Sequence, residues 1–267
     1  MNGATRRCIE VMSGFPDEAA DLRDAYFLDC GLSFDDPKAI TDATVANPVV
    51  LTVAAHGFSN GDLVDVSGAV GMSELNDNRF TVTAATSDQF ALSGTDGTDF
   101  GSYVAGGVVR KAVGAVSGLE HLDGEELTIL ADGSAHAAKT VSSSEVGLDV
   151  PASRVHAGYG YMSDIETLRF DAVMSDGTAQ ARTKNIDHVV LRLHESRGGK
   201  VGPGPDQLDD LELASGGATT AGALFSGDRE MAFPDGFDTD AHIFIRQDQP
   251  LPFSVLSVMA RVNIATR

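Results

Sequence analysis

Short runs of alternating apolar and polar residues dominate the chain, and turn residues separate them at short intervals. Val64 and Val66 alternate with polar neighbours, as do Leu127 and Ile129 before the pair Asp132-Gly133. Alternation with a period of two predicts strands with one buried face, and Asp-Gly predicts a tight hairpin turn. We therefore expect an all-β, multi-domain protein made of small β-barrel or sandwich modules.

The same pattern continues toward the C-terminus. Val146, Leu148 and Val150 alternate before Pro151. Further on, three segments are predicted as strands: 186–193 (IDHVVLRL), 241–246 (AHIFIR) and the closing stretch 250–264. In the first of these, four residues are available to a core: Ile186, Val189, Leu191 and Leu193.

One short helix is expected near the N-terminus, at Pro16–Ala25. Proline stands at its first position, acidic residues fill its first turn, and Arg23 lies nearer its end. These are the preferences of helix termini.

Composition narrows the classes of function. The 267 residues can bury a core, in two or three units rather than one. The net charge of −20 repels phosphate, so sequence-specific nucleic-acid binding is not expected, although DNA could slide past such a surface. No apolar run approaches the roughly 20 residues that span a bilayer, so no membrane insertion is expected. Residues 1–21 have two arginines but no apolar core after them, so we expect no signal peptide there.

One segment resembles a known small module. Residues 55–68 (AHGFSNGDLVDVSG) and 71–94 (GMSELNDNRFTVTAATSDQFALSG) resemble the β module that phage tail proteins share with one domain of ubiquitin-activating enzymes. The resemblance implies the fold only. Those enzymes keep their catalytic cysteine outside this module, and residues 38–111 contain no cysteine.

Other segments resemble the C-terminal region of the tail nozzle, or tail tubular, proteins of short-tailed bacteriophages. They are 26–34 (YFLDCGLSF), 118–132 (GLEHLDGEELTILAD), 148–168 (LDVPASRVHAGYGYMSDIETL) and the order of strand-like segments up to residue 264. The long N-terminal part of those proteins has no counterpart here, which implies a fragment, a split-gene product or a shortened relative.

The resemblance also implies a domain organisation. In the phage family the first of these segments runs almost directly into the second, so residues 38–111 are interpreted as an inserted β-barrel module. Residues 1–37 and 112–160 then form one discontinuous β domain, and 161–267 form a C-terminal sandwich-like domain. Insertion at a surface turn is tolerated because loop-closure entropy grows slowly with loop length.

No residue pattern identifies a catalytic, cofactor-binding or metal site, so we expect no enzyme and no cofactor. The seven histidines (His56, His121, His136, His156, His188, His194 and His242) match no zinc motif. Cys8 and Cys30 could pair, although nothing in their spacing requires it. Residues 235–240 (DGFDTD) are the nearest approach to a calcium loop, with the glycine misplaced.

Nucleophile and phosphate motifs are absent from the sequence as well. No G-x-S-x-G elbow occurs, and residues 198–205 (GGKVGPGP) lack the G-K-[ST] of a phosphate loop. The basic stretch 192–200 (RLHESRGGK) is interpreted as a solvated loop, or as a contact for an acidic neighbour or a phosphate.

The resemblance implies a structural component of the virion tail, made in the host cytoplasm. Copies would form a homo-oligomeric ring, with sixfold symmetry expected, around the channel for DNA ejection, next to adaptor and fibre proteins. Ring contacts are heterologous, and edge strands and the loops 94–107 and 198–206 are candidate interfaces. The alternatives are a receptor- or glycan-binding accessory protein of the virion and an envelope-degrading hydrolase.

Overall fold

The structure, a computed structural model, describes residues 26–174, 177–213, 224–233 and 236–265. The protein is all-β, as the alternation predicts. Over these residues the only helical segments are the 3-10 turns η2 (Ser73–Leu75) and η3 (Glu120–Leu122). The helix expected at 16–25 and Cys8 lie outside the described residues. No described helix has the length and apolar character needed to cross a membrane.

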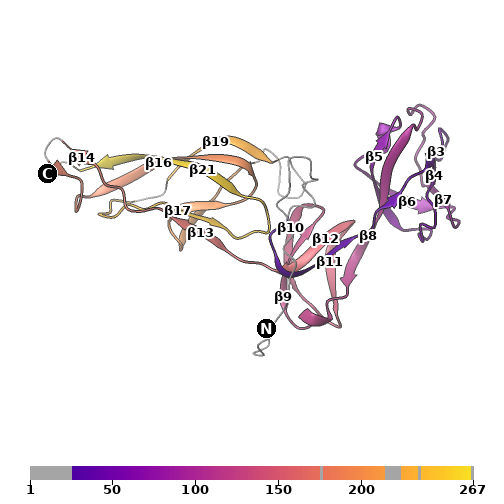
Figure 1. Cartoon of the computed structure of the whole chain (residues 1–267), viewed down its shortest axis with the longest axis horizontal. Helices are drawn as coiled ribbons and strands as arrows, with labels where there is room; N and C mark the ends of the chain where they lie inside the picture. The colour runs from indigo at the N-terminus through magenta and orange to yellow at the C-terminus, as the bar shows by residue number, and fades with distance from the viewer. Residues whose placement is uncertain (1–25, 175–176, 214–223, 234–235, 266–267) are drawn as a thin grey trace. The chain divides into compact units, whose positions relative to one another are not determined.

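The chain divides into two compact units, and each is described by itself. Over the described residues, the first unit comprises 31–132 and 136–157, and the second comprises 26–30, 133–135 and 158–265. Figure 1 colours them by position in the chain, with indigo to magenta strands in the first unit and orange to yellow strands in the second.

The first unit contains a small module of strands that curl around one core (Figure 1). Its sheet has the order β8-β5-β6-β7-β4-β3, and β2 also pairs with β8. The strands are β2 (Lys38–Ala39), β3 (Asp42–Ala43), β4 (Val50–Thr52), β5 (Leu63–Val70), β6 (Asn78–Thr83), β7 (Gln89–Leu92) and β8 (Ala105–Ser117). Val64 and Val66 are buried, which confirms the inward face that alternation predicts for β5.

A second sheet of the first unit brings together segments from both sides of the module in the sequence. Its order is β1-β12-β9-β10. The strands are β1 (Asp29–Asp35), β12 (Arg154–Tyr159), β9 (Glu126–Ala131) and β10 (Ser134–Thr140). The remaining strand of the unit, β11 (Glu145–Ala152), pairs with the end of β8, whose earlier residues pair with β5. One continuous strand therefore belongs to the module and to its neighbour.

The turn between β9 and β10 is the two-residue hairpin that Asp132-Gly133 predicts. Both residues have positive φ, +47° and +74°. Two positive φ values match the twist of the flanking strands, and Asp and Gly tolerate them. Leu127 and Ile129 on β9 are fully buried, as their alternation predicts.

The turn sequences around Gly61 and Gly124 have the same hydrogen-bond pattern. The Gly61 N–H donates to the carbonyl of Val82 (2.9 Å), and the Val82 N–H donates back to the residue that follows Gly61 (2.8 Å). Gly124 and Val141 repeat both bonds, at 3.0 and 2.9 Å. The sequences around the two glycines, SNGDLVDV and LDGEELTIL, share a Gly, an acidic residue and two alternating apolar residues, and they form a similar turn.

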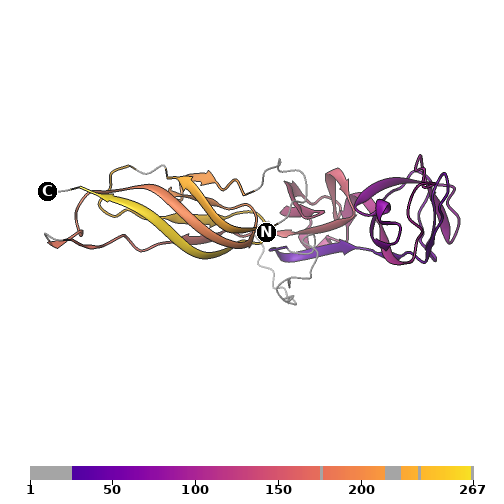
Figure 2. The same cartoon turned by 90° about the horizontal axis from the view of Figure 1, so that it is seen from above.

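The second unit has two main sheets whose facing side chains form one core. Figure 2 shows its long strands twisting together. The orders are β13-β20-β17-β18 and β19-β16-β21, with a separate hairpin β14-β15. The strands are β13 (Ser163–Glu166), β14 (Val173–Met174), β15 (Gly177–Thr178), β16 (Lys184–Ser196), β17 (Lys200–Gly204), β18 (Gln207–Asp210), β19 (Phe225–Ala232), β20 (Phe244–Gln247) and β21 (Ser254–Ile264).

The four apolar residues expected in the core from β16 are all buried there. They are Ile186, Val189, Leu191 and Leu193. The first two are three residues apart, which strict alternation does not allow. A register shift between Ile186 and His188 reverses the phase of the strand, so that both face inward.

Candidate functional site

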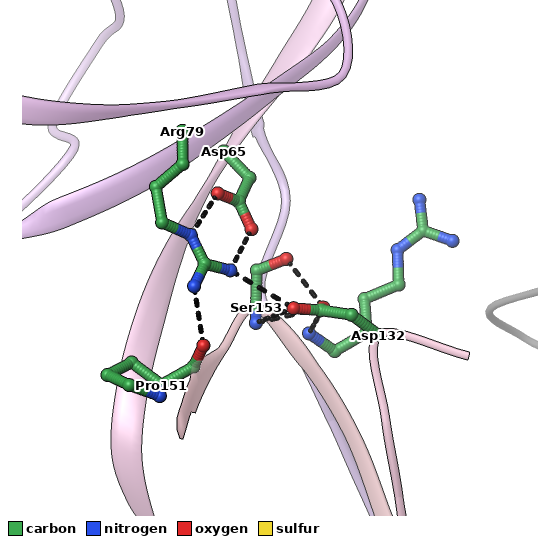
Figure 3. Close-up of polar contacts among 6 residues, drawn as sticks. Asp65, Arg79, Asp132, Pro151 and Ser153 are labelled. Carbon is green, nitrogen blue, oxygen red and sulfur yellow. Dashed lines mark hydrogen bonds and ion pairs between the residues drawn. The ribbon is translucent and has the colours of Figure 1, made fainter. Parts of the chain in front are cut away.

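The most connected polar group of the first unit surrounds Arg79 (Figure 3). Asp65 on β5 and Arg79 on β6 are cross-strand partners. The Arg79 Nε and Nη2 donate to the two carboxylate oxygens of Asp65, both at 2.7 Å. This is the two-pronged geometry in which an arginine–carboxylate pair is strongest.

Arg79 also reaches beyond the module. Its Nη1 donates to the Pro151 carbonyl at 2.6 Å, and its Nη2 to Asp132 Oδ2 at 3.1 Å. Pro151 belongs to β11, and Asp132 opens the hairpin between β9 and β10. One guanidinium therefore joins the module to two segments that follow it in the sequence. We call this group of residues, Asp65, Arg79, Asp132, Pro151 and Ser153, the Arg79 junction.

Asp132 anchors the other side of the junction. Its Oδ1 accepts the Ser153 N–H (3.0 Å), the Ser153 hydroxyl (2.9 Å) and the Arg154 N–H (2.9 Å), as Figure 3 shows. The Asp132 N–H in turn donates to the Arg154 carbonyl (2.8 Å). The carboxylate is thus held by backbone on one side and by Arg79 on the other.

The junction favours a permanently charged guanidinium. The hydrogen bonds from Arg79 to Asp65 raise the pKa of Arg79 above its ordinary value; burial opposes them, and the charges of Asp65 and Asp132 add to them. The Arg79 side chain is 32% exposed and that of Asp65 19%, so solvent screens the group only in part.

A second set of contacts lies where the chain enters and leaves the module. Arg110 Nε on β8 donates to Asp35 Oδ1 at the end of β1 (2.6 Å), and Arg110 Nη1 donates to the Ser67 hydroxyl (3.3 Å). Beside it, Lys111 pairs with Asp62 at 2.8 Å. Burial alone would raise the pKa of Asp62, but the hydrogen bonds from Lys111 and the Ser59 N–H keep it lowered.

The carboxylates and guanidinium of the Arg79 junction are engaged with one another. Asp65 and Arg79 are 14 residues apart in the sequence. Asp132 and Pro151 lie 53 and 72 residues beyond Arg79, and only the fold brings them to it. Sequence reasoning found the Asp132-Gly133 turn but missed its carboxylate as an acceptor.

The histidines are not gathered at one site. Over the described residues, no group of three or more His, Cys, Asp or Glu side chains is arranged to hold a metal ion. His56 is buried in the module core, where its Nδ1 accepts the Phe58 N–H (2.9 Å) and its ring packs against Phe58 and Phe90. His156 is buried too, 2.7 Å from the Ser33 hydroxyl.

A lysine occupies the acidic loop that resembles a calcium site. Lys184 is 1% exposed, and its Nζ donates to the Thr239 carbonyl at 2.7 Å. Its backbone N–H and carbonyl pair with Asp238. The loop carbonyl therefore already meets a cation supplied by the chain itself. Asp235 lies outside the described residues.

Two cations of the basic stretch 192–200 are paired with carboxylates of the chain. Arg192 donates two hydrogen bonds to Asp228, at 2.7 and 2.8 Å, and Lys200 pairs with Asp248 at 2.5 Å. The loop interpretation is wrong for most of this stretch, because residues 192–196 belong to β16 and Lys200 begins β17. The pairing disfavours a phosphate site at Arg192 and Lys200, because a paired cation has less charge to offer a ligand.

A shallow, half-open pocket of about 280 Å³ lies in the second unit. Its lining is Phe170, Asp171, Ala172, Ala260, Val262 and Ile264. The one carboxylate, Asp171, accepts hydrogen bonds from Thr178 and Gln180 at 3.3 and 2.6 Å. Asp171 is the one polar side chain of the lining, so the pocket offers no acid–base pair.

One comparison with known proteins identifies part of the chain. Residues 46–112 match the family model of the ubiquitin-activating enzyme E1 FCCH domain. The small module is therefore an FCCH-like β domain, as the resemblance of residues 55–94 implies. No curated protein matches the chain.

Proposed function

We propose that this chain is a structural component of the tail of a short-tailed phage virion, of the nozzle type, in which copies form a ring around the DNA channel. The observation that supports the proposal most is the sheet β1-β12-β9-β10. It joins strands from three segments that resemble the phage proteins, 26–34, 118–132 and 148–168, although the FCCH-like module separates the first from the other two in the sequence.

The Arg79 junction fits a mechanical role. A module attached by two strand connections could swing about them. Arg79, Asp132 and the Arg110–Asp35 pair add lateral ties between the module and its neighbours. Charge-assisted contacts of this kind give a defined orientation more than they give affinity for a ligand. A tail component that decorates a ring needs such a fixed orientation.

The net charge of −20 also fits a surface past which DNA moves. Like charge prevents phosphate from binding there. In the proposed ring each copy uses two different patches, because the contact is heterologous.

Immunogold electron microscopy of particles from the source lysate, with antibody to this chain, tests the proposal. Gold at the tail tip is the expected result. Gold on fibres alone would favour the receptor- or glycan-binding alternative. Absence of label from intact and disrupted particles would overturn the virion assignment.

A further inference from the structure

Strand β21 is a long edge strand. It spans Ser254–Ile264, 11 residues, and pairs with β16 on one side. Over the described residues it has no partner strand on the other side. An unpaired edge presents a row of N–H and C=O groups to which another strand can add.

The edge of β21 has few of the features that usually prevent such pairing. Those features are charged side chains, prolines, β-bulges and short length. β21 has one such irregularity, a register shift against β16 at Leu256, near its N-terminal end. Within Ser254–Ile264 the one charged residue is Arg261, and there is no proline or glycine. Arg261 is already bound, because its Nε and Nη2 donate to the two carboxylate oxygens of Asp187 at 2.7 Å each.

Other edge strands of the described sheets do carry those features. The opposite edge of the same sheet, β19, contains Gly227, Asp228, Arg229 and Glu230 in eight residues. β13 and β18 have four residues each, with two acidic residues in each. The contrast within one sheet distinguishes an edge suited to solvent, β19, from an edge suited to a partner strand, β21.

The core beside β21 is also incompletely covered. Val255, Val258, Ala260 and Val262 pack against the core of the second unit but are only partly buried. Ala260, Val262 and Ile264 continue into the wall of the 280 Å³ pocket. On the outer face, Leu256 is 63% exposed and Met259 41%. An added strand would cover apolar surface on both faces.

We propose that β21 pairs antiparallel with β21 of a second copy of this chain, so that the two three-stranded sheets become one. A two-fold axis then passes near Met259, the middle residue of Ser254–Ile264. Centred there, Arg261 lies opposite Ser257 of the other copy, and no like charges face each other. Antiparallel self-pairing is favoured over pairing with β19 of a second copy, which would be parallel and would bury the charges of β19.

The proposal does not rest on the proposed function. A two-fold contact closes a pair, whereas a ring uses heterologous contacts. The two can therefore fail separately.

The test is the molar mass of the full chain by light scattering and sedimentation, with two variants of opposite charge. Met259→Lys and Met259→Glu each place like charges across the axis, while Met259 is exposed enough for the fold to tolerate either. The wild-type chain should have twice the 27.9 kDa of one copy. Each variant should have the mass of one copy, and an equimolar mixture of the two should regain the pair.

Leu168→Lys is the matched control, because Leu168 is 91% exposed and lies outside β21; it should keep the wild-type mass. Circular dichroism checks that every variant is folded. A wild-type chain that has the mass of one copy at about 100 µM would overturn the proposal, because even a weak pair forms at that concentration. So would a pair or ring that Met259→Lys leaves intact. If both Met259 variants are folded and have the mass of one copy but their mixture does not pair, β21 contacts some other strand of the second copy. That result would also overturn the proposal.

Discussion

Arg79 and Asp65 stand opposite each other on β6 and β5 and share two hydrogen bonds of 2.7 Å, while Arg79 also binds Asp132 and the Pro151 carbonyl. A cross-strand pair inside the module thus becomes a tie to the strands that follow it. The first two predictions concern this tie.

Replacing Arg79 should loosen the module. Arg79→Ala removes four hydrogen bonds and leaves two partly buried carboxylates without their cation, so we expect a loss of about 1–3 kcal/mol in the free energy of unfolding. Arg79→Lys should recover little, because lysine lacks the two-pronged geometry. Urea unfolding followed by circular dichroism measures the loss.

Arg192→Ala is the control for that experiment. Arg192 makes the same two-pronged contact with Asp228, but its side chain is 54% exposed and the pair ties nothing beyond neighbouring strands. Its urea midpoint should move less than that of Arg79→Ala. An equal shift would show that the junction adds nothing to a simple surface pair.

Asp132→Ala should expose the backbone of the junction. The change removes the acceptor of the Ser153 and Arg154 N–H groups and places alanine at a φ of +47°. We expect a loss of about 2 kcal/mol. Asp132→Asn should lose less, because asparagine keeps one oxygen and tolerates positive φ. Hydrogen exchange at those two amides should quicken in Asp132→Ala; unchanged exchange would contradict the assignment.

Gly101 should tolerate no side chain. A Cβ there would lie 2.1 Å from the Gly71 carbonyl oxygen, a backbone atom that cannot swing away. Gly101→Ala should therefore destabilise the module by about 1–3 kcal/mol. Gly114→Ala is the control, because a Cβ at Gly114 meets nothing within 4 Å. Thermal unfolding of both variants measures the difference in stability. Equal melting temperatures would contradict the close approach of residue 101 to the Gly71 carbonyl oxygen.

Asp187 should make the second unit sensitive to acid. Hydrogen bonds from Arg261 lead the causes that lower the pKa of Asp187 from 3.8 to about 2; burial opposes them, and a hydrogen bond from Asn263 supports them. Because the folded pKa is the lower one, the stabilisation is complete above about 3.8 and is lost as the pH falls toward about 2. Asp187→Asn should melt below the wild type at pH 7 and together with it near pH 2. A constant difference across melting scans from pH 7 to pH 2 would contradict this.

Local patterns predicted much of the fold. Val64, Val66, Leu127 and Ile129 are buried as their alternation predicts, because a strand places successive side chains on opposite faces whatever its partner. The same rule fails at Val150, which alternates with Val146 but is 64% exposed. The register of β11 against β8 shifts between Gly147 and Ala152. Pro151 marks this stretch, since proline within a sheet is confined to edges and bulges, but the local pattern does not predict which side chains the shift turns outward.

The sequence by itself determined that this protein is built of strands and tight turns, and where many of them lie. The alternation of apolar and polar residues, the turn residues and the motif of the FCCH-like module are all properties of residues that are neighbours in the chain. Tertiary structure alone decided which polar groups meet. Arg79 reaches Asp132 across 53 residues and Pro151 across 72, and β21 is left at an edge. Such outcomes depend on strand order and register, which are set by the packing of the whole core rather than by any one segment.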